Sequence, residues 1–316
     1  MVGFKLMNRL IFVPQYPTPM RYQEWWYTEF PLQLSEYFEE VIVVGELDKN
    51  RAIVKDMKGF SPVVDAIAFE LAQMNQFMSM GLREDDTLLV ADLSFPGFFS
   101  SVLHHRSLEN SYAICHGTSK NAFDYFSKTR KSKWKIESSH AGLFKKVFVA
   151  THYHKDKLGW KNIEVIPFPF PPFSSPFHFP PCRRTLISVG RDGIQKRNKT
   201  LERRLEKKFG FIGRQRFDTW EDYYCYVSES KVMIITAKEE TYGYQVVDAI
   251  LSQCVPVAPN KFSYPELLPR ECLYDDYKEL EVAVEKVVSG DILVPICLLK
   301  KEAGEFYKRI VKEMMS

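Results

Sequence analysis

Short, unbroken apolar runs that alternate with longer amphipathic stretches constrain the fold of this chain more than any other feature. In the first half the runs are RLIFV (9–13), EEVIVVGE (39–46), TLLVADL (87–93), SYAICHG (111–117) and KVFVAT (146–151). Strands that are apolar throughout and are separated by helices are what a parallel sheet with both faces covered requires. The pattern therefore predicts an α/β fold.

The stretches between these runs predict helices. Residues 24–38 follow a proline-containing loop and lead into the second strand. Residues 62–80 carry apolar side chains three and four residues apart, which is the spacing of one helix face, at Val63, Ile67, Leu71, Met74 and Met78.

A proline-rich segment divides the chain. Residues 166–182, IPFPFPPFSSPFHFPPC, hold seven prolines and five phenylalanines between positions 167 and 181. Proline fixes φ and removes a backbone donor, so this segment is neither a helix nor a central strand. We expect an interdomain crossover whose phenylalanines pack on both domains. The alternative, a proline-rich ligand for a recognition module, would leave many aromatic rings in water.

A second α/β series follows the proline-rich segment. Its expected strands are residues 185–190, 209–213, 231–236 and 255–259, and its expected helices are 199–208, 219–230, one beginning near Gly243, and 276–288. We therefore place a first domain at 1–166, the crossover at 167–182, a second domain at 183–295 and an amphipathic helical tail at 296–316. Packing of this tail back on the first domain is one option. Two such domains facing each other form a cleft at the carboxyl ends of both sheets.

Composition narrows the class of protein. The 316 residues are 45% hydrophobic and 26% charged, as in globular proteins, and they hold no apolar run of about 18 residues that would span a membrane. The net charge of +3 does not by itself imply a nucleic-acid partner. The scattered cysteines at 115, 182, 225, 254, 272 and 297 indicate neither a zinc site nor a disulfide framework. We expect a cytoplasmic protein with reduced cysteines, in the host cytoplasm if the chain is viral.

Two acids flank the start of one helix in the stretch KEETYGYQVVDAILSQCVPV (238–257). In a helix from Gly243, the side chains of Tyr244, Asp248 and Ser252 share one face. We expect Thr241 to cap this helix. Glu240 then lies just before the free backbone N–H groups of the first helical turn, which favour anions. The alternative is that Asp248 is simply a buried acid paired with a basic residue elsewhere.

Cations collect where the first strand of the second domain ends. Arg191 follows that strand, and Lys196, Arg197 and Lys199 lie in the next residues; between 191 and 216 there are ten basic and three acidic residues. Such a set can neutralise a diphosphate, and charge grows on a departing diphosphate during transfer. For one subset, Arg203, Arg204, Lys207 and Lys208, we expect only a solvated helix face.

Together these residues resemble the donor domain of GT-B glycosyltransferases of the family-4 retaining group. That pattern is Gly-Arg, a downstream Lys, Glu-x7-Glu with an aromatic-Gly pair, and Gly-x-Pro-Val. The matching residues, in order over about 185–290, are Gly190, Arg191, Lys196 or Arg197, Glu240, Tyr242, Gly243, Asp248, Pro256, Val257 and Glu266. The chain departs from the pattern at Asp248, which stands where the family has Glu, and at Cys254, which stands where it has Gly.

The resemblance implies a GT-B fold of two Rossmann-like domains and a retaining transfer from a UDP- or GDP-sugar, with no metal required. It implies that Arg191 and Lys196 bind the donor diphosphate, that Glu240 and the Tyr242–Gly243 backbone hold the sugar, and that Asp248 binds the ribose. It also implies that His116, at the end of a strand in the first half, contacts the sugar. The remaining donor-site candidates are Gly190, Arg197, Gly213, Thr241 and Tyr244.

The first half resembles the family less, because the loop after its first strand lacks the usual glycines. Aromatic residues near the expected cleft, in MRYQEWWY (20–27), suit a base or a sugar ring. His152 and His154 flank Tyr153 and, on a strand, would share one face without a nearby third metal ligand. A cationic run, with Lys128, Arg130, Lys131, Lys133 and Lys135 around Trp134, is a candidate contact with an anionic surface or an exposed loop without a partner.

The acceptor stays open between a glycan, a lipid and a hydroxymethylated pyrimidine in DNA. The last is included because the chain resembles in size the small GT-B enzymes that glycosylate modified bases in phage DNA. A non-catalytic protein that binds sugars or nucleic acid through a degenerate donor site is the alternative. A dinucleotide-dependent oxidoreductase is disfavoured because no G-x-G-x-x-G follows a predicted strand.

Overall fold

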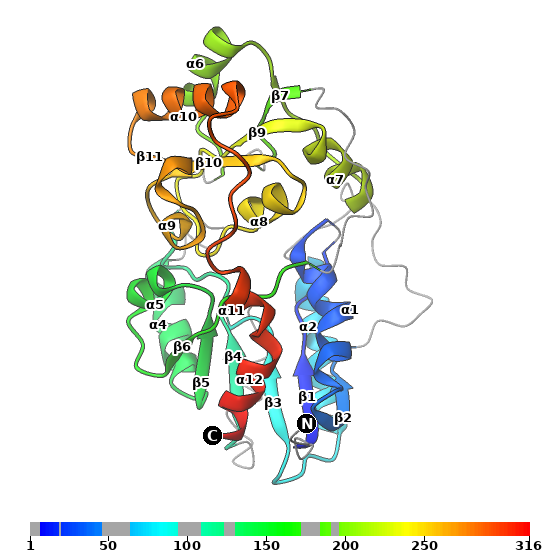
Figure 1. The fold of residues 1–316 in the computed structure, drawn as a ribbon. Coiled ribbons are helices and arrows are strands. Elements are labelled where there is room, and N and C mark those ends of the chain that lie inside the picture. The colour runs from blue at the N-terminus through cyan, green and yellow to red at the C-terminus, as the bar shows by residue number, and fades with distance from the viewer. Residues whose placement is uncertain are drawn as a thin grey trace.

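The computed structural model describes residues 7–18, 20–45, 64–93, 109–122, 130–171, 184–190 and 196–316. They form two α/β domains, the first in the lower half of Figure 1 and the second in the upper half. The sheet of the first domain has the strand order β2-β1-β3-β4-β5-β6, and every pair of neighbours is parallel. Its strands are β1 (Met7–Val13), β2 (Phe38–Val43), β3 (Thr87–Val90), β4 (Ser111–Ile114), β5 (Lys146–Val149) and β6 (Ile163–Val165).

The second domain has a five-stranded parallel sheet in the order β11-β10-β9-β7-β8. Its strands are β7 (Arg184–Ile187), β8 (Ile212–Gly213), β9 (Ser230–Ile234), β10 (Val255–Pro259) and β11 (Leu273–Tyr274). The predicted α/β fold with two Rossmann-like sheets is thus confirmed.

Helices cover both sheets. In the first domain they are α1 (Tyr22–Leu34), α2 (Val64–Ser79), α4 (Arg130–Ala141) and α5 (His152–Leu158). In the second they are α6 (Lys199–Phe209), α7 (Trp220–Ser228), α8 (Tyr244–Leu251), α9 (Tyr264–Leu267), a 3-10 turn (Arg270–Cys272) and α10 (Tyr277–Ser289), followed by α11 (Lys300–Gly304) and α12 (Phe306–Met315). None of the helices in the described ranges is long and apolar enough to cross a membrane.

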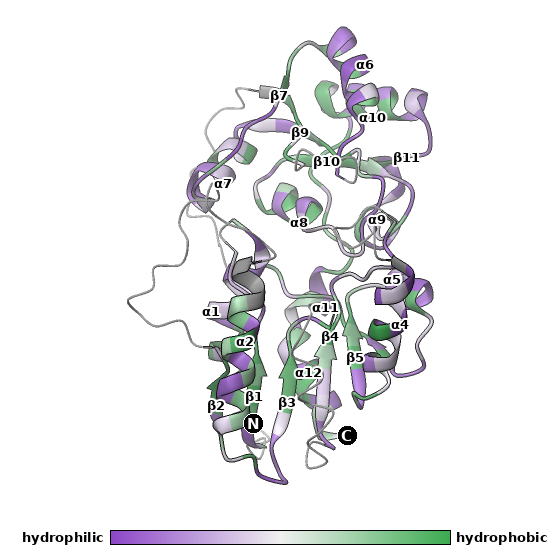
Figure 2. Ribbon diagram, turned by 180° about the vertical axis from the view of Figure 1, so that it is seen from behind, coloured by the Kyte–Doolittle hydropathy of each residue, from purple (hydrophilic) through white to green (hydrophobic). Residues whose placement is uncertain are grey.

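Strand β1 shows why its sequence is apolar at consecutive positions. Leu10 and Phe12 belong to the core layer on one face of the sheet, and Ile11 and Val13 belong to the layer on the other. Leu10, Ile11 and Phe12 have no exposed surface. Because successive side chains of a strand point to opposite faces, a strand covered on both faces must be apolar throughout. Strand β1 is accordingly hydrophobic over most of its length in Figure 2.

Several predicted elements have different bounds in the structure, most clearly one strand and one helix. The strand expected at 209–213 is wrong for its first three residues, because Phe209 completes α6 and Gly210, at a φ of 86°, ends that helix. The helix expected at 24–38 begins two residues earlier and ends at Leu34, and Phe38 already belongs to β2.

The C-terminal segment crosses back to the first domain, where α12 (red in Figure 1) lies against the sheet. The hydroxyl of Tyr112 donates to the carbonyl of Met314 at 2.9 Å, and Lys146 pairs with Glu313 at 2.6 Å. Arg309 donates to the carbonyl of Val165 at 3.0 Å. The tail therefore completes the layer on that face of the first sheet.

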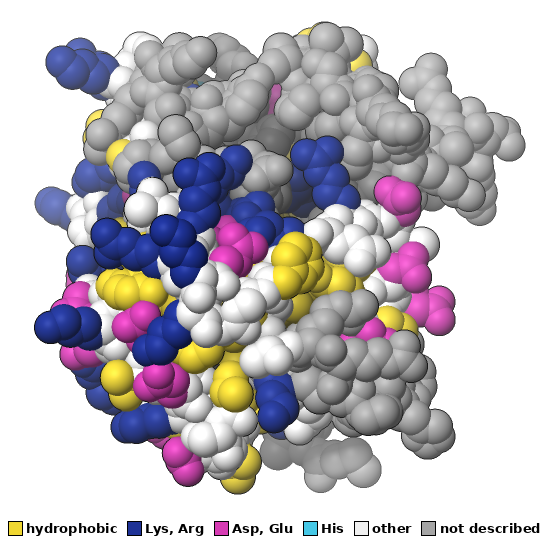
Figure 3. Space-filling view, turned by 90° about the horizontal axis from the view of Figure 1, so that it is seen from above, with side chains coloured by type: hydrophobic (Ala, Val, Ile, Leu, Met, Phe, Trp, Pro, Cys, Tyr) yellow, Lys and Arg dark blue, Asp and Glu magenta, His cyan; other side chains and the backbone are white. Residues whose placement is uncertain are grey.

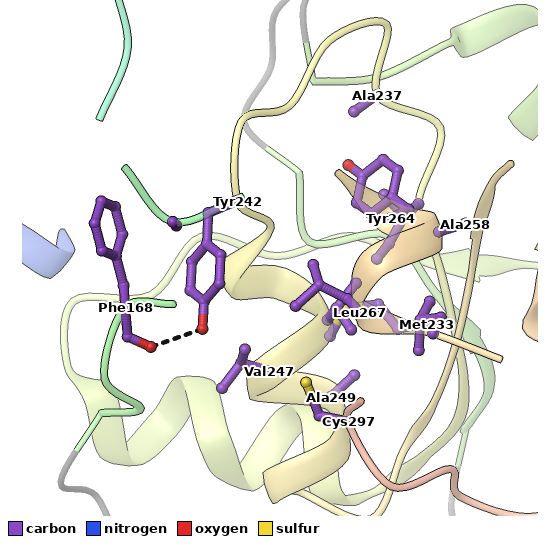
Figure 4. Packing of buried hydrophobic residues seen from close by; sticks show 14 of the residues in the cluster. Phe168, Met233, Ala237, Tyr242, Val247, Ala249, Ala258, Tyr264, Leu267 and Cys297 are labelled. Carbon is purple, nitrogen blue, oxygen red and sulfur yellow. Dashed lines mark hydrogen bonds between the residues drawn. The ribbon is translucent and has the colours of Figure 1, made fainter. Parts of the chain in front are cut away.

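An aromatic junction joins the two domains. Phe168, in the crossover, lies with its ring centroid 5.2 Å from that of Trp26 in the first domain and 5.5 Å from that of Tyr242 in the second. The Tyr242 hydroxyl donates to the Phe168 carbonyl at 2.8 Å, as Figure 4 shows. Residues 172–183, including Cys182, lie outside the described residues. Trp25 and Trp26 are buried at this junction, at 4% and 2% exposure. The expectation that residues 20–27 offer stacking surfaces to a base or a sugar ring is therefore wrong for these two side chains.

Candidate active site

Gly243 is the N-cap of helix α8, and its φ of 111° is a conformation that L residues rarely adopt. A Cβ at this position would lie 3.0 Å from Leu267 and 3.3 Å from Tyr264, which Figure 4 places close to α8. The expected cap by Thr241 is wrong, because Gly243 is the N-cap and no side chain caps the helix. The turn before α8 is therefore held by backbone geometry that only glycine allows.

Replacing Gly243 by alanine should lower the melting temperature by at least about 2 °C, because an L residue in this region costs about 1–2 kcal/mol and the new methyl group would press on Leu267. Gly304→Ala is the matched control, since a Cβ there meets nothing within 4 Å. Thermal unfolding followed by circular dichroism gives both values. Equal melting temperatures for the two variants would contradict the role given to Gly243.

The two charged groups that the sequence places near this turn meet in the structure. Lys196 Nζ lies 2.5 Å from Glu240 Oε2, and both side chains are largely buried. Lys196 lies next to Gly190, three residues after β7, where a Cβ would lie 2.8 Å from the Lys196 carbonyl. The backbone at Lys196 thus approaches position 190 as closely as a glycine permits. Arg191 lies outside the described residues.

Arg197 serves a different partner from Lys196. Its guanidinium donates to both carboxylate oxygens of Glu202, a residue with no exposed surface. Glu202 also accepts from the hydroxyls of Ser188 and Thr236, at 3.0 and 3.2 Å, and from Arg214. These donors hold the pKa of Glu202 below its ordinary value despite burial. No motif in the sequence indicated this buried network near the end of β7.

Gly213 has a packing role in the described structure. It ends β8, and a Cβ there would lie within 2.2 Å of the Tyr226 hydroxyl and 3.2 Å from Ile187. A side chain there would require the Tyr226 ring to move. Its assignment to the donor site stays a prediction.

Asp248 is held by two tyrosines of the neighbouring helix α7. The hydroxyls of Tyr223 and Tyr224 each donate to one of its oxygens at 2.9 Å. Asp248 is 7% exposed, and burial raises its pKa to about 6 against the opposing effect of the two phenols. The alternative that a basic residue pairs with Asp248 is wrong, because the partners of its carboxylate among the described residues are both tyrosines. The tyrosines of TWEDYYCYVSES (219–230) were not considered as partners of this acid from the sequence.

Asp248→Asn should change the pH dependence of stability in a defined direction. Because the pKa of Asp248 is 3.8 ordinarily and about 6 in the folded chain, the unfolded chain loses this proton at lower pH. Ionisation of Asp248 thus lowers the free energy of unfolding progressively between about pH 4 and 6. The melting temperature of the variant relative to the unmodified protein should rise over this range and level off above it. A difference that is constant with pH would contradict the assignment.

His116 lies among aromatic rings at the domain junction. Its Nε2 is 3.0 Å from the carbonyl of Ala91, which can only accept, so Nε2 carries the proton and Nδ1 is the acceptor. Its ring centroid lies 4.8 Å from Tyr22 and 4.5 Å from Trp26. Burial lowers the pKa of His116 to about 3, so the ring is neutral. It can therefore accept a hydrogen bond from a hydroxyl.

His152 and His154 lie on helix α5, so the strand face expected for them is wrong. Thr151 caps this helix by accepting from the His154 N–H, which a reading based on alternation overlooks. The two preceding backbone N–H groups, of His152 and Tyr153, both donate to the Glu266 carboxylate of the second domain at 2.8 Å. Among the described residues no three His, Cys, Asp or Glu side chains gather as a metal site would.

Buried polar side chains also lie at the carboxyl ends of the first-domain strands. Gln15, after β1, donates to Asp92, after β3. Glu70 of α2 is 9% exposed, and burial raises its pKa to about 8. These residues carry no motif, so the sequence did not single them out. They belong to the domain edge that faces the second domain.

The cationic run at 128–135 is helical from residue 130, so the exposed-loop interpretation is wrong there. The Trp134 ring stacks on Trp160 at 5.4 Å and Lys120 lies over it, while Lys133 pairs with Glu137 at 3.8 Å. Lys131 and Lys135 are exposed; Lys128 and the side chain of Arg130 lie outside the described residues. Contact of this helix with an anionic surface stays a prediction.

The basic residues of α6 lie at the far end of the second domain. Figure 3 looks down on this end and shows Lys and Arg interspersed with Asp and Glu. Lys208 pairs with Glu285 at 2.7 Å, and the guanidinium of Arg204 lies over the ring of Tyr277 at 5.3 Å. These contacts fit a solvated helix face.

Comparison with known proteins gives the fold. No family model matches the chain. A segment of 55 residues, 17% of this chain and 15% of the relative, is 38% identical to a tRNA-queuosine alpha-mannosyltransferase of Drosophila melanogaster. Among solved structures, TarM of S. aureus, crystallised with UDP, superimposes with a TM-score of 0.53 at 15% identity. The superposition covers 77% of this chain and 56% of TarM, so the chain spans about half the length of that protein.

A second solved structure is similar over nearly its whole length. An alpha,alpha-trehalose-phosphate synthase (UDP-forming) from Burkholderia vietnamiensis gives a TM-score of 0.57 at 13% identity, covering 98% of this chain and 99% of the other. At these identities the likeness establishes the architecture of two facing Rossmann-like domains. The chain therefore has the fold of GT-B glycosyltransferases.

Proposed function

We propose that this protein is a retaining glycosyltransferase that moves a sugar from a nucleotide-sugar donor to an acceptor hydroxyl. The observation that supports this proposal best is that groups from both domains meet at the start of α8. Lys196 and Glu240 form a pair within the second domain, and Thr241, next to Glu240, bonds to the backbone of His116 in the first. A cation, a carboxylate and a neutral imidazole are the groups needed for a diphosphate and a sugar.

Each group has a defined task in the proposed reaction. Lys196, with Arg191, neutralises the diphosphate as the bond between its oxygen and the sugar C1 breaks. The acceptor oxygen forms the new bond to C1 on the same face, and its proton passes to the departing phosphate oxygen. Glu240 accepts hydrogen bonds from sugar hydroxyls, and Nδ1 of His116 accepts another. The transfer is accelerated because these side chains bind the sugar and the diphosphate more strongly in the transition state than in the ground state.

The donor proposal draws support from two solved structures with this fold, TarM in complex with UDP and the UDP-forming trehalose-phosphate synthase, while the acceptor is less constrained. The Drosophila relative is described by its action on queuosine in tRNA, but only 55 residues match. A glycan, a lipid and a hydroxymethylated pyrimidine in DNA remain the acceptor classes of the proposal.

Incubation of the purified protein with UDP-glucose, UDP-N-acetylglucosamine and GDP-mannose tests the donor half without an acceptor. We expect slow, protein-dependent release of free nucleoside diphosphate from one donor, because water can replace the acceptor hydroxyl. Binding of UDP or GDP by calorimetry identifies the nucleotide. A protein that neither binds a nucleoside diphosphate nor hydrolyses any of a broad donor panel would contradict the proposal.

A second candidate function follows from Asp248. Both of its oxygens already accept from tyrosines, so a ribose must either displace a phenol or bind at the remaining lone pairs. A protein that binds nucleotide sugars without turning them over is the alternative that this contact favours. Tight donor binding with no hydrolysis and no transfer would distinguish it from the enzyme.

A further inference from the structure

The loop that leads into α8 is fastened to the first domain by two hydrogen bonds at a single residue. The Thr241 hydroxyl donates to the carbonyl of His116 at 2.6 Å, and the Thr241 carbonyl accepts from the hydroxyl of Thr151 at 2.7 Å. Thr241 is 8% exposed and Thr151 has no exposed surface. Buried hydrogen bonds of this kind restrict geometry strongly, because neither partner can turn to water.

The anchor on the first-domain side is itself fixed. Thr151 caps α5, and the N–H groups of His152 and Tyr153 are held by Glu266 of the second domain at 2.8 Å. The other bond of Thr241 reaches the backbone of His116, whose ring is fixed by the carbonyl of Ala91. Thr241 is thus tied to two places in the first domain, which follow the paired strands β4 and β5.

The position of Thr241 gives these bonds a consequence for the proposed reaction. Its neighbour in the chain is Glu240, and its bonded neighbour in space is His116. These are the two groups that the proposed function assigns to the sugar, and they come from different domains. Resting on that proposed function, we infer that Thr241 is a positioning residue that sets Glu240 in register with His116 for the transfer step.

A positioning role distinguishes Thr241 from residues that merely hold the domains together. A positioning residue affects the chemical step more than nucleotide affinity, because the diphosphate is bound by Lys196 and its neighbours rather than by the loop. Misplacement of a reacting group by about 1 Å can cost on the order of 10²-fold in rate. A hydroxyl that served packing alone would change stability and leave the rate of the remaining folded protein unaltered.

The test compares Thr241→Val, which keeps the shape and removes the hydroxyl, with Thr241→Ser, which keeps the hydroxyl. With the donor that the unmodified protein hydrolyses, the valine variant should release nucleotide about 10- to 100-fold more slowly at saturation. Its dissociation constant for UDP or GDP should stay within about 3-fold, since the loop does not hold the diphosphate. The serine variant should recover most of the rate. Tyr112→Phe is the matched control, since it removes a buried bond from a hydroxyl to a carbonyl far from this loop and should leave the rate unchanged.

A second measurement keeps the test independent of activity. Hydrogen exchange of peptides covering 240–247 and 116–122 should accelerate together in Thr241→Val, and not in Tyr112→Phe. An unchanged rate and exchange, a rate that serine does not restore, or a parallel loss of nucleotide binding would each overturn the inference. If the unmodified protein neither binds nucleotide nor hydrolyses donors, the proposed function fails, and uncoupled exchange in the two peptides then overturns the positioning role as well. Should Thr241→Val not fold, Thr241→Ala removes the same hydroxyl with less volume to place.

Discussion

Glu240→Gln should lower donor hydrolysis, and transfer once the acceptor is found, by about 10²-fold or more while the fold survives. The carboxylate accepts hydrogen bonds from sugar hydroxyls more strongly than an amide does, and the sugar carries positive charge in the transition state. In the structure, Lys196 is the cation paired with this carboxylate at 2.5 Å. Removing the negative charge leaves Lys196 available to a diphosphate, so the affinity for UDP or GDP should stay the same or increase. Steady-state release of nucleotide, together with calorimetry, measures both quantities.

The neighbouring acid provides the matched control. Glu239 is 5% exposed and pairs with Lys157 of α5, so it belongs to the contact between the domains. Glu239→Gln should reduce the melting temperature and leave the turnover of the folded protein within about 3-fold. If both variants lose activity equally, or if Glu240→Gln keeps near-normal turnover, the role given to Glu240 is wrong.

Lys196→Ala should lower turnover by about 10²-fold and also weaken nucleotide binding. The ammonium group would meet the diphosphate in the ground state and, more strongly, when charge builds on the leaving oxygen. A charge-assisted hydrogen bond contributes about 1.5–3 kcal/mol, which corresponds to a loss of about 10- to 100-fold in affinity for UDP or GDP. This combination of rate and affinity differs from that expected for Glu240→Gln, whose nucleotide affinity is preserved.

Lys207→Ala controls for the overall basic charge of the second domain. Lys207 is exposed on α6, at the end of the domain away from the first one, and its removal should affect neither quantity. Binding measured at two salt concentrations separates a specific contact from general electrostatic attraction. A loss of affinity in Lys207→Ala equal to that in Lys196→Ala would contradict a dedicated diphosphate contact.

The parallel sheets were predictable because burial on both faces leaves a mark on every strand. In β1 and β10 five consecutive residues are buried, and the charged side chain among them, Arg9, is paired with Asp86, so the apolar runs stand out without any alignment. Strand ends and short edge strands were less predictable. β8 has two residues, and its neighbour Phe209 is equally suited to the buried face of a helix, so local pattern could not place the boundary.

The candidate donor residues could be read from the chain because Glu240, Tyr242, Gly243 and Asp248 lie within nine consecutive positions at the start of one helix. The requirement for glycine at 243 is likewise local, since it follows from a single backbone angle. The partners of these residues lie far away in the sequence. Tyr223 and Tyr224 hold Asp248, and His116 and Thr151 hold Thr241, across separations that no spacing rule addresses.

The sequence by itself therefore determined the α/β class and the order of the elements, because hydrophobic period and turn chemistry act over a few residues. It also placed Glu240 and Gly243 just before α8 and Asp248 within that helix. Only the tertiary structure decided that Asp248 would bind two phenols and that Trp26 would be buried at the junction. It also decided that the Thr241 hydroxyl would bond to the first domain instead of capping α8. These outcomes depend on which side chains two separate domains bring into contact, and burial forces each polar group to find its partner there.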